Sequence, residues 1–418
     1  MTTSGQKDPQ TLTKVGEVRP RETALLDLAM ASGAGRSWIG RTRHFVTAMK
    51  RAHPDPRHSP SVQHKQPRPS VPAMASENLT RSIVGLGNPL LDISADVTPA
   101  FLEKYGLKLA NAILADESHA PMFAELAQLK PDFIAGGATQ NSIRVAQWML
   151  NKHNKAATSF FGSVGQDANG AKLKECAQAD GVNVSYLEHA DIKTGTCAVC
   201  IVDSERSLVA DLSAANHFHH DHLAKPESQE IINKGQFFYS AGFHLTVSPP
   251  AVMTLADHAQ ANNKTFLINL SAPFIVEFFK DPLMAAIKSA DFVFGNESEA
   301  KTLGKVQGWG EDIKEIALKT AQLEKASGAR CRTVVFTQGA DCTIVVHQGK
   351  VLTFDVPKME AASIVDTNGA GDAFVGGFIS RLALGLPLEQ CVNAGHWAAQ
   401  VVLARSGCTF PKECDFQE

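Results

Sequence analysis

Phe237-Phe-Tyr-Ser-Ala241 is the first of four apolar runs that follow at regular intervals, the others being TFLINL at 265–270, DFVF at 291–294 and TVVFT at 333–337. Stretches with helical spacing separate these runs, around residues 250–262, 282–288 and 312–325. Apolar strands that alternate with helices predict a mostly parallel sheet covered by helices on both faces. The fold class is therefore α/β.

The same pattern extends to both sides of this segment, less regularly. Further strands are expected at 82–87, 158–163 and 196–202, and a helix at 140–150. A hairpin and two long helices are expected near the C-terminus, at 343–347 with 351–356, 371–384 and 388–405. Short segments interrupt the alternation at 93–138 and near 192–212. We interpret these two segments as a small β-rich lid inserted into the α/β domain.

Charge and cysteine content exclude several classes of protein. Residues 1–72 carry 12 Lys/Arg and 5 Asp/Glu, and the remaining residues carry 28 basic and 38 acidic side chains. An acidic body lacks the basic footprint that nucleic-acid binding needs. The 8 cysteines are scattered, as in proteins of reducing compartments, and no apolar run reaches the roughly 18 residues of a membrane span. We expect a cytoplasmic or nuclear protein with no nucleic-acid or membrane partner.

Residues 1–76 differ in composition from the rest of the chain. The part from 51 to 72 is dense in proline, histidine and arginine and has no apolar periodicity, which predicts a disordered extension. Residues 31–72 hold eight Lys/Arg and one acidic residue, a composition that also occurs in organelle transit peptides. The four acidic residues among 1–30 favour a simple extension. Residues 77–418 are then expected to form the functional domain.

The string DTNGAGDAFVGG at 366–377 gives the strongest chemical signal. Gly369, Ala370 and Gly371 precede an apolar helix, so their backbone N–H groups can point outward without side-chain obstruction. A helix N-terminus carries partial positive charge and unsatisfied donors, which suit a transferring phosphoryl group. Asp372 falls in the first helical turn, where its carboxylate could take a proton from an attacking hydroxyl. The alternative is a helix cap in a glycine-rich turn.

Two further motifs predict a site for a hydroxylated substrate. Paired Gly136 and Gly137 precede a helix and can serve as a hinge or admit a ligand close to the backbone. Asn141 offers both a donor and an acceptor to a sugar hydroxyl. The string GNPLLD at 87–92 places Asn88 and Asp92 beyond a strand end, where α/β sheets bind ligands. A simple strand–helix turn remains the alternative for the glycine pair.

The string NESE at 296–299 follows the predicted strand at 291–294. The oxygens of Asn296 and Glu299 suit hydrated Mg²⁺ better than a soft metal, with Glu299 acting through water. An ordinary helix cap with an acidic first turn is the alternative. A second polar cluster, HFHHDH at 217–222, looks like a metal site, but adjacent histidines cannot all converge on one ion. We interpret that cluster as a solvated loop.

Taken together, the strings resemble the ribokinase or phosphofructokinase-B superfamily of small-molecule kinases. DTNGAGDAFVGG looks like its C-terminal signature, and GGATQNS (136–142) looks like its N-terminal glycine-pair motif. Within it they resemble the kinases whose acceptor is adenosine, through GNPLLDIS (87–94), TGTCAVC (194–200), NLSAPFI (269–275), FGNESEA (294–300) and GCTFP (407–411). The resemblance covers residues 80–416. It implies a ribokinase-like fold, with ATP and Mg²⁺ as co-substrate and cofactor.

The resemblance also implies roles for individual residues. Asp372 would be the base for the 5′-hydroxyl, Gly369, Ala370 and Gly371 the anion hole, and Arg206 a cation on the lid. Asp92, Asn88, Gly136, Gly137 and Asn141 would bind the ribose side. Asn296 and Glu299 would order Mg²⁺ and the ATP phosphates, and Thr337, Gly339 and His396 would border the ATP base. His244 stands where such kinases often have phenylalanine against the substrate base, which leaves the base preference open.

Three functions are open at this point. The first is an ATP-dependent kinase that phosphorylates adenosine, acting as a monomer. The second is a kinase of the same superfamily for another nucleoside or a free sugar. The third is a non-catalytic nucleoside-binding protein, which the presence of Asp372 and the anion hole disfavours.

Overall fold

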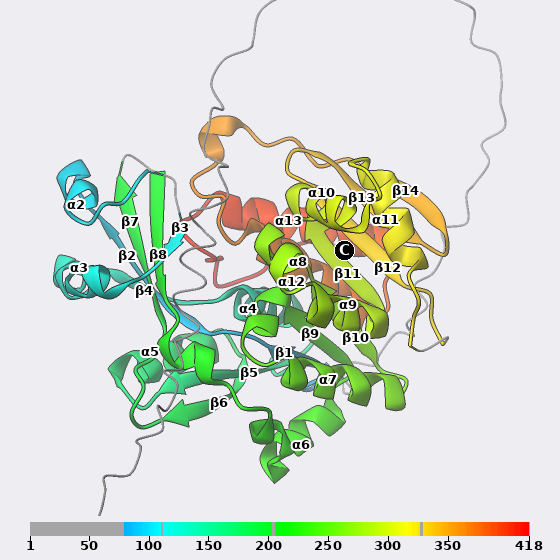
Figure 1. Ribbon diagram of the computed structural model, residues 1–418, viewed down its shortest axis with the longest axis horizontal. Helices are drawn as coiled ribbons and strands as arrows, with labels where there is room; N and C mark the ends of the chain where they lie inside the picture. The colour runs from blue at the N-terminus through cyan, green and yellow to red at the C-terminus, as the bar shows by residue number, and fades with distance from the viewer. Residues whose placement is uncertain (1–78, 110–111, 203–204, 327–328, 418) are drawn as a thin grey trace, which may run out of the picture. The chain divides into compact units, whose positions relative to one another are not determined.

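The computed structural model describes residues 79–417, apart from 110–111, 203–204 and 327–328. The expected disordered extension and its transit-peptide alternative lie outside the described residues. A nine-stranded sheet and a separate five-stranded sheet carry the fold (Figure 1).

The large sheet has the strand order β14-β13-β12-β11-β10-β9-β1-β5-β6. Its strands are β1 (Ile83–Leu86), β5 (Thr158–Gly165), β6 (Asn183–His189), β9 (Phe237–Ala241), β10 (Thr265–Asn269), β11 (Phe292–Asn296), β12 (Thr333–Gln338), β13 (Asp341–His347) and β14 (Lys350–Phe354). Seven strands are parallel, and β13 and β14 form an antiparallel hairpin at one edge. The predicted mostly parallel sheet is thus confirmed.

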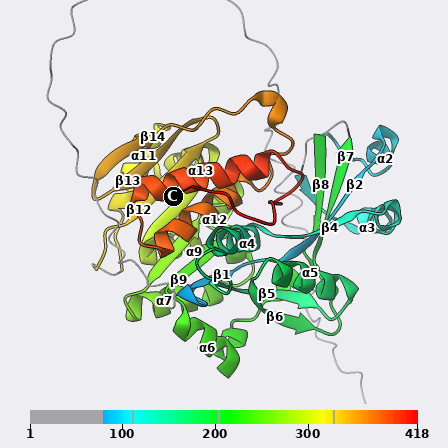
Figure 2. The same cartoon turned by 180° about the vertical axis from the view of Figure 1, so that it is seen from behind.

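Helices cover both faces of this sheet, as Figures 1 and 2 show from opposite sides. One face packs against α6 (Pro226–Lys234), α7 (Pro249–Ala261), α8 (Pro273–Phe278), α9 (Lys280–Ser289), α10 (Glu297–Gln307) and α11 (Ile313–Gln322). The other packs against α4 (Ala138–Leu150), α5 (Ala168–Ala179), α12 (Ala370–Ala383) and α13 (Leu388–Leu403). Neighbouring strand residues serve opposite faces: Val84 lies in the first core and Ile83 in the second.

The small sheet has the order β3-β8-β7-β2-β4. Its strands are β2 (Leu90–Asp96), β3 (Ala112–Leu114), β4 (Asp132–Gly136), β7 (Thr196–Val202) and β8 (Glu205–Asp211). Two helices, α2 (Pro99–Lys104) and α3 (Ala120–Leu126), bury Phe101 and Met122 against it. The predicted separate small sheet is confirmed, whereas the sequence pattern missed these helices because each has only one or two turns.

Short 3₁₀ helices join several elements: η2 (Glu117–His119), η3 (Ala127–Leu129), η4 (Ser213–His217), η5 (His220–Ala224), η6 (Gly242–Thr246) and η7 (Ala361–Ser363). Two of them, η4 and η5, contain three of the four histidines of the cluster at 217–222. His222 is buried, and its Nε2 lies 3.1 Å from the carbonyl oxygen of Ser185. The expectation of a solvated loop is therefore wrong for His222, because η5 turns that ring into the core beside Phe218.

No helix of the described segments is both long and apolar enough to cross a membrane. The carboxyl ends of the parallel strands lead directly into the predicted site residues. Asn88 follows β1, Asn296 ends β11, and Thr337 lies opposite Asn296 in β12. This is the edge of an open α/β sheet at which ligands bind.

Candidate active site

The N-terminus of α12 opens on free space. Gly369, at the N-cap, has a left-handed backbone with φ of 76°, and Asp372 is the third residue of the helix. A Cβ placed on Gly371 would meet no atom within 4 Å. Because the first N–H groups of a helix lack intrahelical partners and carry partial positive charge, this end can accept an anion beside Asp372.

Asp366 fixes the loop that precedes α12. Its Oδ1 accepts a hydrogen bond from the N–H of Asn368 at 3.0 Å, and its Oδ2 accepts one from the N–H of Gly407 at 2.8 Å. The carboxylate is buried. The loop is thereby tied to the C-terminal segment, which holds the helix N-terminus in place. The sequence analysis assigned no role to Asp366, although an aspartate before glycines is a typical turn former.

Asn141 brings the glycine-pair motif to the catalytic motif. Its Nδ2 donates to the Oδ2 of Asp372 at 3.1 Å, although the two residues are 231 positions apart in the sequence. The contact is possible because α4 and α12 approach closely. A Cβ on Gly376 would overlap the carbonyl oxygen of Ser142. The second half of the DTNGAGDAFVGG string therefore serves helix packing.

The glycine pair lies against the segment that follows β1. A Cβ on Gly136 would overlap the carboxylate of Asp92, and one on Gly137 would overlap the backbone oxygen of Asn88. Gly137 also has a φ of 92°, a conformation that residues with a side chain rarely adopt. Gly137 is therefore required by the static structure, and Gly136 by the present position of the Asp92 carboxylate. Whether they also act as a hinge stays a prediction.

His244 joins the same group of residues from η6. Its Nδ1 lies 2.7 Å from the Oδ1 of Asn88, and its ring packs edge-on against Phe218 at 5.3 Å between centroids. Burial lowers the pKa of His244 to about 3, so the ring is neutral. The side chain is 1% exposed. His244 therefore lies inside the protein and supports the side chain of Asn88.

Burial raises the pKa of the Asp372 carboxyl to about 7. The hydrogen bond from Asn141 opposes this shift, and the negative charges of Asp92 and Glu299 add to it. Two carboxylates from other elements, Asp92 on β2 and Glu299 on α10, thus lie within electrostatic reach of Asp372. A carboxyl group with a pKa near neutrality is well matched to general-base work.

Asn296 and Glu299 form a capping box at the start of α10. The Oδ1 of Asn296 accepts from the N–H of Glu299 at 2.9 Å, while the carboxylate of Glu299 accepts from the N–H and Nδ2 of Asn296 at 2.9 and 2.7 Å. The helix-cap interpretation is therefore confirmed. Each Glu299 oxygen accepts one hydrogen bond and keeps a further lone pair, so these oxygen ligands would fit a hard, hydrated Mg²⁺.

Residues predicted to border the ATP base lie at the hairpin edge of the large sheet. Thr337 is next to Asn296 across the β11–β12 pairing. Gly339 lies in the β12–β13 turn with a φ of 60°, and a Cβ placed on it would meet no atom within 4 Å. His396 is different: it is 4% exposed, and its Nε2 lies 2.8 Å from the hydroxyl of Thr343. Thr337 and Gly339 lie at the strand ends, whereas His396 packs beneath the hairpin.

Arg206 lies on the small sheet, in β8, opposite Ile201 of β7. Asp92 belongs to β2 of the same sheet. The sheet therefore carries both a carboxylate of the predicted substrate site and the predicted lid cation.

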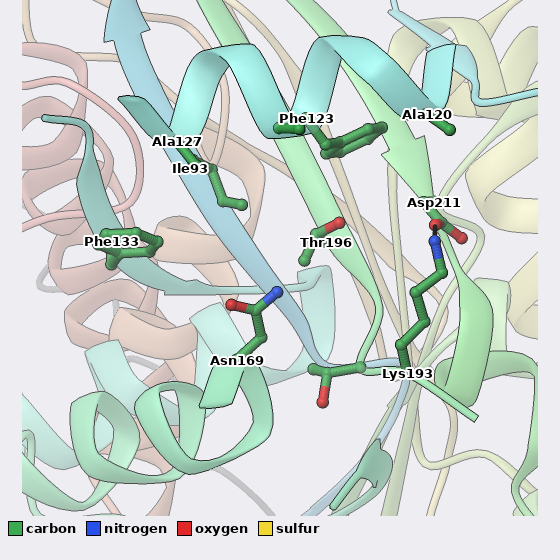
Figure 3. A pocket seen from close by; sticks show the side chains of 11 residues that line it. Ile93, Ala120, Phe123, Ala127, Phe133, Asn169, Lys193, Thr196 and Asp211 are labelled. Atoms are coloured by element: carbon green, nitrogen blue, oxygen red, sulfur yellow. Dashed lines mark ion pairs between the residues drawn. The ribbon is translucent and has the colours of Figure 1, made fainter. Parts of the chain in front are cut away.

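A pocket of about 270 Å³ lies between the small sheet, α3 and α5 (Figure 3). Ile93 and Thr196 line its floor, Phe123 and Phe133 line two sides, and Lys193 reaches Asp211 at 3.2 Å. Because neighbouring side chains of a strand point to opposite faces, Ile93 and Asp92 serve different faces of β2. This pocket is therefore separate from the predicted substrate site.

Sequence reasoning missed Arg144, which is buried behind Asn141. Its side chain bonds to Asn141, Asp180 and two backbone carbonyls. A signal was present in the string TQNSIRVAQWML (139–150), where one arginine interrupts a helix that is otherwise polar only at its start and at one glutamine. Residues 139–150 are all buried, so the arginine had to find partners inside the protein.

Comparison with known proteins identifies the family of the chain. Residues 99–414 match the pfkB family of carbohydrate kinases. Adenosine kinase 2 of Arabidopsis thaliana is 53% identical over 344 residues, which cover 82% of this chain and 99% of the plant protein.

Two solved structures are similar as well. The adenosine kinase of Anopheles gambiae, in complex with P1,P4-di(adenosine-5) tetraphosphate, matches with a TM-score of 0.74 and 44% identity over 81% of this chain and 99% of that one. The adenosine kinase of Schistosoma mansoni, in complex with adenosine and AMP, matches with a TM-score of 0.71 and 33% identity over 79% and 98%. The chain therefore belongs to the pfkB family of carbohydrate kinases and to the branch of it that these adenosine kinases form.

Proposed function

We propose that this protein is an adenosine kinase, which transfers the γ-phosphoryl group of ATP to the 5′-hydroxyl of adenosine to give AMP and ADP. The hydrogen bond between Asn141 and Asp372 carries the proposal, because it joins the substrate motif to the carboxylate beside an open helix N-terminus. The choice of acceptor follows from the similarity to adenosine kinases, one of which was solved with adenosine and AMP, and the kinase family implies ATP as the phosphoryl donor.

Asp92 and its neighbours bind the ribose in this proposal. The Asp92 carboxylate lies against the backbone of Gly136, so a diol that it binds would sit on the glycine pair with no side chain in the way. A carboxylate can accept one hydrogen bond from each of two vicinal hydroxyls. Asn141 then lies between the Asp92–Gly136 contact and Asp372, which positions the 5′-hydroxyl of the ribose near the Asp372 carboxylate.

Asp372 accepts the proton of the 5′-hydroxyl as the oxygen attacks the γ-phosphorus. The N–H groups at the start of α12 face the phosphoryl group as it transfers. In a loose transition state the charge is spread over the phosphoryl oxygens, so positioning and neutralisation matter more than basicity. Arg206 on the small sheet supplies a further positive charge when that sheet closes over the site.

The nucleotide side uses the ends of β11 and β12. Asn296 and Glu299 would hold hydrated Mg²⁺, and Thr337 and Gly339 would border the base of ATP, with His396 packed beneath the hairpin against Thr343. When bound, Mg²⁺ neutralises charge on the phosphates. The side-chain oxygens of Asn296 and Glu299 are the type of ligand that a hard, hydrated cation prefers.

The cytoplasm is the proposed location, with the enzyme acting as a monomer. All 8 cysteines are free thiols, three of them at least partly exposed, as is usual in a reducing compartment. Fractionation of cells that express the full chain, and light scattering of the purified protein, test these two points.

A coupled assay with a panel of acceptors tests the function. Purified protein with Mg-ATP is offered adenosine, guanosine, cytidine, ribose and fructose, and ADP release is followed. We expect turnover with adenosine to exceed that with every other acceptor by at least about tenfold in kcat/KM. Preference for a free sugar would replace the proposal by its second candidate, and binding without turnover would support a non-catalytic protein.

A further inference from the structure

A buried cation stands behind the Asn141–Asp372 pair. Arg144 follows Asn141 by one helical turn on α4 and is 5% exposed. Its Nη1 donates to the Oδ1 of Asn141 at 3.3 Å, and its Nε donates to the Oδ2 of Asp180 at 2.6 Å. Arginine stays charged in proteins, and a buried charge is tolerated only when paired. Asp180, at the C-terminus of α5, is the counter-ion.

The contact with Arg144 determines which way the Asn141 amide faces. The two ends of an asparagine side chain differ in that one donates and the other accepts. A guanidinium can only donate, so it selects the oxygen of Asn141. The NH₂ group is then left to face Asp372, where it stabilises the ionised carboxylate. If the amide turned over, its oxygen would face the carboxylate and disfavour ionisation.

The same guanidinium connects the two halves of the site. Its Nη1 also donates to the carbonyl oxygen of Ala135, the residue before the glycine pair, and to that of Cys408 at 3.2 Å. Cys408 packs directly beneath Gly369, since a Cβ on that glycine would lie 3.0 Å from the Cβ of Cys408. One buried side chain therefore links the end of β4, Asn141 and the support of the α12 N-terminus.

We propose that Arg144 is a positioning residue for phosphoryl transfer, which fixes the Asn141 amide with its NH₂ group toward Asp372 and, paired with Asp180, holds α4 in register with β4 and the C-terminal segment. The inference rests on the proposed function, because its readout is the transfer reaction.

Several other groups face Asp372 and must be kept constant in a test. Burial, Asp92 and Glu299 all raise its pKa, while Asn141 lowers it. Tyr239 on β9 and Cys408 also lie within reach of its charge. Burial raises the pKa of Cys408 to about 12, and it also raises the pKa of Tyr239 above the usual value of a tyrosine, so both groups stay protonated. Arg144 acts on Asp372 through the Asn141 amide.

The test is a double-mutant cycle read out by pH profiles. The four proteins are wild type, Asn141→Ala, Arg144→Met and the double variant, each assayed for kcat/KM with adenosine between pH 5.5 and 9. In the pH profile, the fall of kcat/KM toward low pH is called the acid limb. Arg144→Met is expected to move this limb upward by about 0.5–1 pH unit, because the Asn141 amide is then free to turn and no longer favours ionised Asp372. In the Asn141→Ala background, the same change should add no further shift.

Matched variants separate positioning from stability. Arg332, which directly precedes β12, is also a buried arginine and donates four hydrogen bonds to backbone carbonyls. Arg332→Met should therefore lower the melting temperature without moving the acid limb of the pH profile. Arg144→Lys keeps a donor for the Asn141 oxygen and should restore at least half of the shift. If Arg144→Met does not fold, Asp180→Asn serves as the milder variant, with a smaller shift in the same direction.

Two results would overturn the inference. One is an active Arg144→Met, or folded Asp180→Asn, enzyme whose acid limb coincides with that of wild type. The other is a shift of equal size with and without Asn141. A wild-type protein that phosphorylates no acceptor would instead overturn the proposed function, so the two failures are distinguishable.

Discussion

The acceptor side and the nucleotide side of the site are built differently. We define the acceptor side as Asn88, Asp92, Gly136, Gly137 and Asn141, and the nucleotide side as Asn296, Glu299, Thr337 and Gly339. Acceptor-side residues come from two distant segments that touch each other, and Asp372 and His244 are bonded to them from elsewhere in the chain. Space is so limited that a Cβ on either glycine would overlap a neighbouring atom. On the nucleotide side, Asn296 and Glu299 satisfy each other within one helix cap, and the Gly339 turn faces open space.

This difference indicates where selectivity lies. Crowded, cross-linked groups can reject a ligand of the wrong shape, because any misfit leaves buried polar atoms unpaired. A helix cap and an open turn hold a nucleotide mainly by charge and backbone contact. We therefore expect changes on the acceptor side to alter substrate affinity sharply, and changes on the nucleotide side to have graded effects.

The largest effect is expected where the two sides meet. Asp372→Asn removes the base but keeps a group of the same shape, so kcat should fall by about 10²–10⁴-fold while adenosine still binds. The control is the melting temperature of the variant, which shows whether it folds. Because burial raises the pKa of Asp372 above its unfolded value, the ionised form destabilises the native state at pH 8, and the variant should melt slightly higher than wild type. Turnover within about threefold of wild type would rule out Asp372 as the base.

Gly137→Ala and Gly339→Ala compare the two sides at glycines that both have positive φ. Both glycines have positive φ, 92° and 60°, but only at Gly137 would the new Cβ overlap a neighbour, the carbonyl oxygen of Asn88. We expect the KM for adenosine to rise more than about tenfold in Gly137→Ala. Gly339→Ala should leave both KM values within about threefold. Equal effects would remove the distinction between the sides.

Asp92→Ala should act on binding more than on turnover. A carboxylate that holds the ribose diol makes similar contacts in the ground and transition states, so KM should rise by about 10–100-fold with a smaller loss in kcat. Steady-state kinetics with adenosine measure both quantities. If the wild-type enzyme used 2′-deoxyadenosine as well as adenosine, this role of Asp92 would be untenable.

Glu299→Gln should have the smallest effect, and the effect should depend on pH. Burial raises the pKa of Glu299 to about 7, so the side chain is mostly ionised at pH 8 and mostly protonated at pH 6. Glutamine resembles the protonated form and can still close a capping box. We expect the KM for Mg-ATP to rise a few-fold at pH 8 and little at pH 6, with the KM for adenosine unchanged. A pH-independent change would indicate a purely structural role.

The sequence predicted the large sheet better than the small one. The runs at 237–241, 265–270 and 333–337 are apolar because those strands are buried on both faces, which gives a strong local signal. Strand β3 has only three residues, β4 is partly exposed, and α2 and α3 have one or two turns. Their structure depends on packing against distant strands, which no local pattern records.

Within the site, the sequence revealed the motifs but not the contacts between them. Gly137 and Asp372 stand out because a helix start demands particular residues. The Asn141–Asp372 bond and the Arg144 network join residues far apart in the chain, and a single sequence contains no signal for such pairs. His396 shows the reverse: a motif residue that the structure buries beneath the hairpin.

The pH dependence of kcat/KM for adenosine, in wild type and in Asn141→Ala, tests the central claim most directly. An ionised Asp372 is required as the base, and its pKa is about 7, so activity should fall as the pH drops below neutrality. Because the phosphates of ATP also titrate near this range, the difference between the two proteins is the decisive quantity. The hydrogen bond from Asn141 stabilises the ionised form, so its removal should shift the acid limb to higher pH. An acid limb that lies at the same pH in both proteins would contradict the account.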